Sequence, residues 1–164
     1  MAKRTWSNRN VHYTTDHMEY FTGYRCAIVA ICSSMGLVNA EILATAVNEN
    51  IFLEYIPKLS IAMGGEPFFL FMDRLSVHMM LTVKDKLDEL DITPIYNCSA
   101  SPDLNPIETC FAQVKLRYKK NRMIALVHKR EFDTEEGISD ALEVITPELV
   151  KACVKRSIYF IHNT

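Results

Sequence analysis

The way in which apolar segments alternate along this chain predicts an α/β fold. Short runs rich in Ile, Val and Phe alternate with longer segments in which apolar residues recur every three or four positions. The order strand, strand, helix, strand, helix, strand, helix is typical of layered α/β proteins. With 164 residues, 49% of them hydrophobic, the chain is expected to form one domain, residues 1–164, with a substantial core.

The first two strands are predicted to form a hairpin. Residues 1–24 are polar and aromatic, with little periodicity. Residues 25–33 then form an apolar run rich in Ile, Val and Cys, and residues 37–46 form a second apolar run. The sequence Ser34-Met35-Gly36 between them has the composition of a turn, so we expect the two runs to pair as neighbouring strands.

A helix is expected to follow the hairpin, with Asn48 as its N-cap. Its apolar residues recur at helical spacing, at Ile51, Phe52, Tyr55, Ile56 and Leu59. Pro57 lies inside this segment, which predicts either a kink or an early start of the helix. The pair Gly64-Gly65 is expected to end it.

A strand, a helix and a second strand are predicted next. Residues 68–72 are continuously apolar, which is typical of a strand buried on both faces. Residues 81–90 are amphipathic and charged and predict a surface helix. Residues 92–96 predict another short strand.

Two further helix starts are marked by proline. Asn105 and Pro106 have the residue types of an N-cap and a first helical position, and this helix is expected to run to about Asn121. The sequence Thr146-Pro147-Glu148 combines a cap, a proline and an acidic residue, and predicts the start of a last helix.

Positive charge is concentrated in one part of the chain. The net charge is −2, so binding to nucleic acid would have to come from a local patch. Such a patch lies between residues 115 and 130 and consists of Lys115, Arg117, Lys119, Lys120, Arg122, His128, Lys129 and Arg130. The alternative interpretation is a solvated helix face without a nucleic-acid partner.

The cysteine pattern and the hydropathy of the chain predict its cellular compartment. The five cysteines are odd in number and lack Cys-x-x-Cys spacing, which argues for reduced thiols and against a disulfide framework or a zinc site. No apolar run approaches the roughly 20 residues of a membrane span. The N-terminal residues lack the apolar core of a signal peptide. We therefore expect an intracellular protein without a membrane partner, nuclear if the cell is eukaryotic and otherwise cytoplasmic.

Two carboxylates occupy positions suited to a metal ion. Asp73 follows the apolar run 68–72, and Glu108 lies near the start of the basic helix. Hard oxygen ligands of this kind suit Mg²⁺ in phosphoryl transfer, so the pair predicts a nuclease or strand-transfer site. The alternative is that these residues have only structural roles. In that case the spacing of Asp73 and Glu108 is a coincidence, His78 is a surface or capping histidine, and Asn105 only caps a helix.

The joint pattern is specific. Two motifs of the chain together resemble the DDE transposases of the mariner-like superfamily. The motifs are Asp73-Arg74-Leu75-Ser76-Val77-His78 and Ser101-Pro102-Asp103-Leu104-Asn105-Pro106-Ile107-Glu108. The 34 residues between Asp73 and Glu108 also resemble the spacing of that family. Weaker similarity extends over the predicted strand pair, the segment from Asn48 to Leu59, and Arg4-Thr5-Trp6-Ser7.

This resemblance implies a ribonuclease-H-like fold, a mixed sheet flanked by helices, in which three carboxylates bind two Mg²⁺ (or Mn²⁺) ions for DNA strand cleavage and transfer. Asp73 would be the second catalytic, metal-binding carboxylate and Glu108 the third. His78 and Asn105 would support them. The family's DNA contacts would map onto the basic helix, at Lys115, Arg117, Lys119, Lys120 and Arg122.

The chain also departs from the family pattern. The family's first catalytic aspartate lies on a strand upstream of the segment that resembles Arg4 to Ser7, so we expect a fold truncated at its N-terminus. Asp16 is the only early aspartate that could substitute. Arg74 stands where the family usually has Asn, and residues 97–100 replace its usual Pro and Tyr.

We therefore predict a transposase-derived domain that binds and processes DNA, with two of the three expected carboxylates. Whether it is an enzyme stays open at this point. The alternative is a catalytically inactive, domesticated module for nucleic-acid binding or for assembly, in which an exposed sheet edge pairs with another chain as a homo-oligomer.

Overall fold

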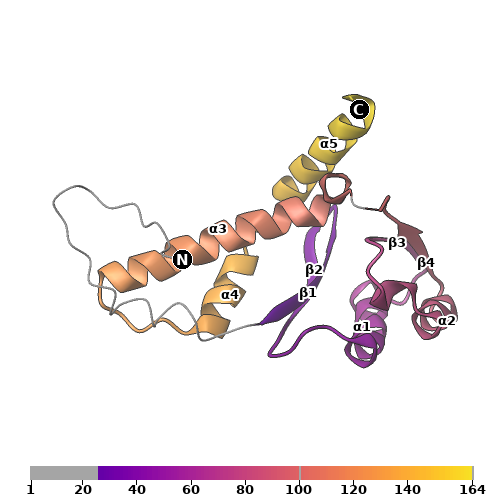
Figure 1. Ribbon diagram of the computed structural model, residues 1–164, viewed down its shortest axis with the longest axis horizontal. Coiled ribbons are helices and arrows are strands. Elements are labelled where there is room, and N and C mark those ends of the chain that lie inside the picture. The colour runs from indigo at the N-terminus through magenta and orange to yellow at the C-terminus, as the bar shows by residue number, and fades with distance from the viewer. Residues whose placement is uncertain (1–25, 100, 164) are drawn as a thin grey trace, which may run out of the picture.

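The computed structural model of the protein describes residues 26–99 and 101–163 (Figure 1). Its helices and strands follow the predicted order and confirm an α/β fold. In chain order they are β1 (Ala27–Ser33), β2 (Gly36–Leu43), α1 (Glu49–Ala62), β3 (Phe68–Met72), α2 (Leu81–Glu89), β4 (Ile92–Tyr96), α3 (Pro106–Val127), α4 (Thr134–Leu142) and α5 (Pro147–Asn163). Two short 3₁₀ turns, η2 (Val77–Met79) and η3 (Pro102–Leu104), precede α2 and α3.

The predicted hairpin is confirmed. β1 and β2 pair antiparallel, from Ala27 opposite Leu43 to Ser33 opposite Gly36. Gly36 has a φ of +101°, and a Cβ added there would lie 3.1 Å from the carbonyl oxygen of Ile145, so the turn requires a glycine. β2 ends three residues before the predicted end of the second run.

The four strands form two separate sheets, where a single mixed sheet was expected. β1 and β2 are joined by a tight turn and are antiparallel, whereas β3 and β4 are joined through α2 and are parallel. Phe68 lies opposite Ile92, and Met72 lies opposite Tyr96. Both kinds of pairing are therefore present, but among the described residues no strand connects β1 to β3.

Helix α1 packs against both sheets. Asn48 caps it, because the side-chain oxygen accepts the N–H of Ile51 at 3.0 Å, and Pro57 is accommodated inside the helix. The first core cluster joins α1 and α2 to strands of both sheets; its buried members are Phe52, Tyr55, Ile56, Leu59, Leu70, Met72, Val83, Leu87 and Ile92, with Val29 and Ile31 of β1 packed against them. One helix thus covers the same side of β1 and of β3.

The prediction that residues 68–72 are buried on both faces is wrong. Leu70 and Met72 are buried, but the intervening Phe69 and Phe71 are 74% and 42% exposed. The apolar run alternates as a strand covered on one face does, since α1 and α2 pack on only one side of β3. Among the described elements, none buries the opposite face.

The second core lies between the hairpin and the three C-terminal helices (Figure 1). Its buried residues are Cys110, Val114, Ile138, Ala141, Leu142, Ile145, Val150 and Cys153. Helix α3 runs to Val127, six residues beyond the predicted end, and α4 was not predicted. None of the described helices has the length and apolar character that crossing a membrane requires.

Candidate functional site

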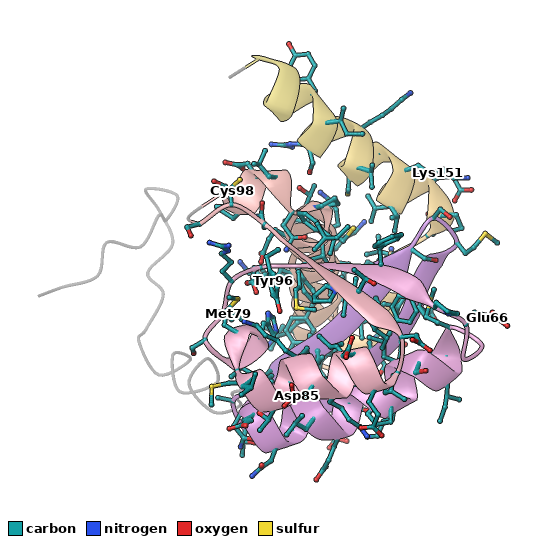
Figure 2. The ribbon with its side chains drawn as sticks, turned by 90° about the vertical axis from the view of Figure 1, so that its right-hand side faces the viewer. Glu66, Met79, Asp85, Tyr96, Cys98 and Lys151 are labelled. Atoms are coloured by element: carbon teal, nitrogen blue, oxygen red, sulfur yellow. The ribbon has the colours of Figure 1, made fainter. Side chains whose placement is uncertain are left out.

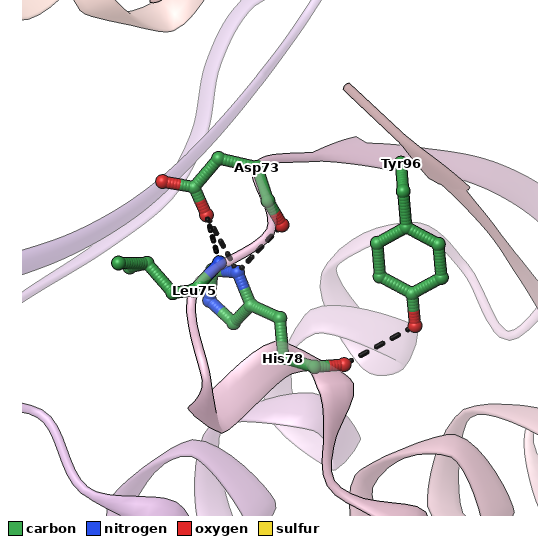
Figure 3. A network of polar contacts seen from close by, with 4 residues as sticks. All are labelled: Asp73, Leu75, His78 and Tyr96. Carbon is green, nitrogen blue, oxygen red and sulfur yellow. Dashed lines mark hydrogen bonds and ion pairs between the residues drawn. The ribbon is translucent and has the colours of Figure 1, made fainter. Parts of the chain in front are cut away.

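Asp73 lies directly after the last residue of β3. Its Oδ1 is 2.8 Å from Nδ1 of His78 and accepts the main-chain N–H of Leu75 at 3.4 Å (Figure 3). The side chain of Asp73 is 37% exposed, and its second carboxylate oxygen points away from both partners in Figure 3. One oxygen is therefore held by the protein while the other is directed outward.

His78 is held in place by three elements. Its Nδ1 also lies 3.2 Å from the carbonyl oxygen of Asp73, and because both neighbours are acceptors, Nδ1 carries the proton and donates it. Its ring packs on Phe52 of α1, with ring centroids 4.6 Å apart. Its own carbonyl accepts the hydroxyl of Tyr96, at the end of β4, at 3.1 Å (Figure 3).

Asn97 connects the end of β3 to the loop before α3. Its main-chain N–H donates to the carbonyl of Met72 at 2.8 Å, and its side-chain amide donates to the carbonyl of Ser101 at 2.7 Å. The same side chain accepts the N–H of Cys98 at 2.8 Å. In Figure 2 the labelled Cys98 marks this loop, beyond Tyr96 at the end of β4. Asn97 is buried, so these bonds fix the start of the Ser101–Glu108 motif beside Asp73.

Glu108 lies in the first turn of α3. Asn105 is buried and caps this helix, since its side-chain oxygen accepts the N–H of Ile107 at 3.4 Å. The N–H of Glu108 donates to the carbonyl of Asn105 at 3.1 Å. The carboxylate of Glu108 is exposed at the N-terminus of a helix, where the helix dipole favours negative charge.

Asp73 and Glu108 are the two carboxylates that the sequence predicts as metal ligands. Their oxygen atoms suit a hard divalent cation, and the second oxygen of Asp73 is directed outward. Within residues 26–99 and 101–163, however, there is no group of three or more His, Cys, Asp or Glu side chains that could hold a metal ion. The early aspartate singled out in the sequence, Asp16, and the segment Arg4 to Ser7 lie outside the described residues.

The cations of α3 divide into two sets. An α-helix turns by about 100° per residue. By this geometry, the first set lies within about 60° around the helix axis and on the same side as Glu108; it consists of Lys115, Lys119 and Arg122. Lys120 and Arg117 are turned by roughly 120° and 180° from Glu108. The four predicted residues from Lys115 to Lys120 are exposed, and Arg122 is half-buried.

An exposed apolar ridge runs between the two sets of cations. It consists of Leu116, Met123 and Val127, which are 62%, 57% and 71% exposed. The face of α3 that points away from the core is therefore amphipathic and not uniformly basic.

Sequence reasoning missed three residues that shape this site. Phe52 was identified only as a core residue of α1, Tyr96 only as part of a strand, and Asn97 only as a departure from a family pattern. One sequence signal could have identified Asn97, namely a polar residue directly after an apolar strand. A polar side chain that is buried at such a position needs hydrogen-bond partners, which neighbouring loops can supply.

Comparison with known proteins identifies the family and the fold. The sequence model of the DDE superfamily endonuclease family matches residues 4–129. The Mos1 transposase paired-end complex with left transposon end is 17% identical, with a TM-score of 0.56 over 96% of this chain and 51% of the other. The chain thus spans about half the length of that transposase. No match was found among curated protein sequences.

Two structures of the isolated Mos1 transposase catalytic domain are also similar. The one with raltegravir and Mn is 17% identical, with a TM-score of 0.51 over 82% of this chain and 76% of the other. The one with raltegravir and Mg is 17% identical, with a TM-score of 0.50 over 80% and 75%. The predicted family and the ribonuclease-H-like fold class are confirmed.

Proposed function

The chain belongs to the DDE superfamily endonucleases, and from this premise we propose that it binds DNA and contributes two carboxylates to metal-dependent cleavage and transfer of DNA strands. The observation that carries the proposal is the connection through Asn97, which joins the end of β3, where Asp73 lies, to the loop that leads into Glu108. The family match extends through both carboxylates.

Asp73 and Glu108 would hold Mg²⁺ or Mn²⁺. The similar Mos1 catalytic domains are described with Mn and with Mg, which supports this choice of ion. A bound ion of this kind supplies Lewis acidity at a phosphodiester and stabilises developing negative charge on oxygen. The protein would present carboxylate oxygens to the ion in a fixed orientation.

His78 would orient Asp73. By donating its Nδ1 proton to Oδ1, it leaves the other carboxylate oxygen directed outward for the ion. The contact with Phe52 restricts the imidazole ring, and the hydrogen bond from Tyr96 holds the main chain of His78. We assign His78 as a positioning residue and Asn105 as the cap that holds the first turn of α3.

A third carboxylate would come from outside the described residues. The facing strands of the two sheets, β1 and β3, are both covered by α1 and are not paired with each other. An additional strand between them would join the sheets into one, and an aspartate on it would lie next to Asp73. An upstream strand or the region around Asp16 are the two candidate sources.

DNA would lie along one side of α3. Lys115, Lys119 and Arg122 extend from Glu108 along about 20 Å of helix, which suits contacts to successive phosphates. The Mos1 paired-end complex contains a transposon end, which supports DNA as the partner. Because the contacts are to phosphates, binding would be independent of sequence and sensitive to salt.

The second candidate function is a DNA-binding or assembly module without chemistry. It is favoured by one observation, namely that the described residues contain no complete metal-binding group. In that case the protein would retain the basic side of α3 and the open edges of β1 and β3, and a second copy could pair with those edges.

One experiment separates these functions. The full chain and its Glu108→Gln variant are incubated with labelled duplex DNA and Mn²⁺, and binding and nicking are measured on the same samples. We expect both proteins to bind DNA equally. Nicking by the wild type that Glu108→Gln abolishes supports the enzyme, and binding without nicking supports the module. Absence of DNA binding by both proteins would overturn the proposal.

A further inference from the structure

The last helix, α5, carries a serine at the end of its buried face. Val150, Cys153 and Ser157 are buried and recur at intervals of three and four residues, so they lie on one side of the helix. Val150 and Cys153 belong to the second core. Ser157 is 3% exposed, and its hydroxyl therefore needs a hydrogen-bond partner inside the protein.

That partner lies in the motif that leads to Glu108. The hydroxyl of Ser157 donates to the main-chain carbonyl of Asp103 at 3.1 Å. Serine hydroxyls inside helices often bond back to the carbonyl four residues earlier. Here the acceptor is 54 residues away along the chain, in the turn η3. Helix α5 also packs against η3 and against α3 (Figure 1), so the bond forms part of a wider contact.

The turn η3 is thereby held from two directions. The carbonyl of Ser101, at its beginning, accepts the side-chain amide of Asn97 at 2.7 Å. The carbonyl of Pro102 accepts the N–H of Asn105 at 2.9 Å, within the turn itself. The next carbonyl, that of Asp103, accepts from α5. Asn97 thus holds the turn from the end of β4, and α5 holds it from the other core.

The path from η3 to Glu108 is short. Only Leu104 and Asn105 separate Asp103 from the first residue of α3. Asn105 caps the helix, and its carbonyl accepts the N–H of Glu108 at 3.1 Å. Pro106 follows the cap and has a fixed φ, which leaves the connection few free torsions. A displacement of Asp103 is therefore passed on to the first turn of α3, where Glu108 lies.

We propose that Ser157 is a positioning residue for Glu108, because it fixes the turn from which α3 begins. The metal-binding part of this inference rests on the proposed function. It deepens that function by giving α5, which lies beyond the residues matched by the family model, a part in the site. Ser157 is buried and acts through the main chain of Asp103, not on DNA or on an ion.

The alternative is that the bond only stabilises the packing of α5. Replacing Ser157 would then lower the stability of the protein without a specific effect on the segment around Glu108. The two interpretations differ in where the protein loosens, which residue-resolved hydrogen exchange measures.

Amide exchange of the metal-free full chain, followed by NMR, tests the connection without metal or DNA. Ser157→Ala removes the donor to Asp103. The amides of Leu104, Asn105 and Glu108 each donate within η3 or the first turn of α3. We expect them to exchange roughly five- to tenfold faster in Ser157→Ala, as the loss of one net hydrogen bond allows.

Two further variants provide the controls. Thr146→Ala weakens the other end of the same helix, because the Thr146 hydroxyl accepts the N–H of Leu149 at 3.3 Å. It should speed exchange at Leu149 and leave the amides near Glu108 unchanged. Ser157→Thr retains the hydroxyl and should restore wild-type exchange near Glu108.

Calorimetric titration with Mn²⁺ tests the consequence for the site. We expect Ser157→Ala to bind Mn²⁺ roughly tenfold more weakly than wild type, the lower end of the range for residues that support a metal ligand. Thr146→Ala should bind as wild type does, and Ser157→Thr should recover the affinity. In a Glu108→Gln background, Ser157→Ala should cause no further loss, because both changes act on the same ligand.

The outcomes separate this inference from the proposed function. Unchanged exchange near Glu108 in Ser157→Ala would overturn the inference, and so would equal changes there in Ser157→Ala and Thr146→Ala. Wild-type affinity for Mn²⁺ in Ser157→Ala would overturn the positioning role. Absence of Mn²⁺ binding by the wild type would refute the proposed metal site, whereas faster exchange in Ser157→Ala would still support the link between α5 and η3.

Discussion

The Nδ1 atom of His78 lies 2.8 Å from Oδ1 of Asp73, and the ring that carries it is packed on Phe52. This arrangement links a carboxylate at the end of β3 to the helix that covers both sheets. The aromatic contact limits rotation of the imidazole, and the hydrogen bond limits rotation of the carboxylate. A histidine six positions after a strand thereby becomes the support of a candidate metal ligand.

Replacing His78 should weaken binding of a divalent ion at Asp73. In His78→Ala the donor to Oδ1 is lost. We expect the affinity for Mn²⁺ to fall by roughly 10–100-fold, because loss of a residue that hydrogen-bonds to a metal ligand typically has an effect of this size. In His78→Asn the side-chain amide can replace the Nδ1 donor, so part of the affinity should return. Titration calorimetry with Mn²⁺ measures both. Equal affinities in all three proteins would exclude the positioning role.

Replacing Asn97 should destabilise the loop before α3. Asn97→Ala removes the side-chain bonds to Ser101 and Cys98 and leaves those main-chain groups without these partners, which costs about 1–3 kcal/mol in the free energy of unfolding. Ser99→Ala, at an exposed position in the same loop, is the control and should change stability little. Urea denaturation measures the difference. A stability loss as small as that of Ser99→Ala would contradict the bridging role.

Removing the cap of α3 should affect stability and DNA cleavage together. Asn105→Ala should cost about 1 kcal/mol, as N-caps generally do. Asp133→Ala is the matched control, because Asp133 caps α4 by accepting the N–H of Glu136 at 2.8 Å. We expect similar losses of stability from both variants. Only Asn105→Ala should also lower any Mn²⁺-dependent nicking, which a gel assay on supercoiled DNA measures.

The two sets of cations on α3 should differ in their contribution to DNA binding. Lys115→Gln combined with Lys119→Gln removes two charges on the side of Glu108, and should reduce the slope of log affinity against log salt by about 2. Arg117→Gln combined with Lys120→Gln removes the same charge from the other sides of the helix and should change the slope less. Fluorescence anisotropy at several salt concentrations measures it. Equal slopes in both double variants would rule out the proposed side.

Stability should depend on pH through Glu148 at the start of α5. Hydrogen bonds from its own main-chain N–H and from the Thr146 hydroxyl hold the pKa of Glu148 below its usual value. The folded state therefore binds this proton less tightly than the unfolded state, so the stabilisation is complete above the unfolded pKa and is lost as the pH falls through the folded one. Thermal unfolding of wild type and Glu148→Gln at neutral and acidic pH measures it. The variants should differ at neutral pH and converge in acid.

Local patterns were sufficient to predict most elements. Asn48, Asn105 and Thr146 mark helix starts because a side-chain oxygen can accept a free N–H at the first turn, and this property belongs to the residue and its neighbours. Helix α4 was not predicted, although Asp133 is a local start signal of the same kind, since its side chain accepts the N–H of Glu136. Helix α3 extends six residues beyond the predicted end at Asn121, and Ala125 in this extension is buried.

The sequence by itself determined the order of strands and helices, the family and the two motifs that carry Asp73 and Glu108, because caps, turns and periodicity act over a few residues. Only the tertiary structure decided that β1–β2 and β3–β4 are separate sheets under one helix, and that Phe69 and Phe71 are exposed. It also decided that Asn97 joins β3 to the α3 loop. These are contacts between residues far apart in the chain, and their formation depends on how whole elements pack.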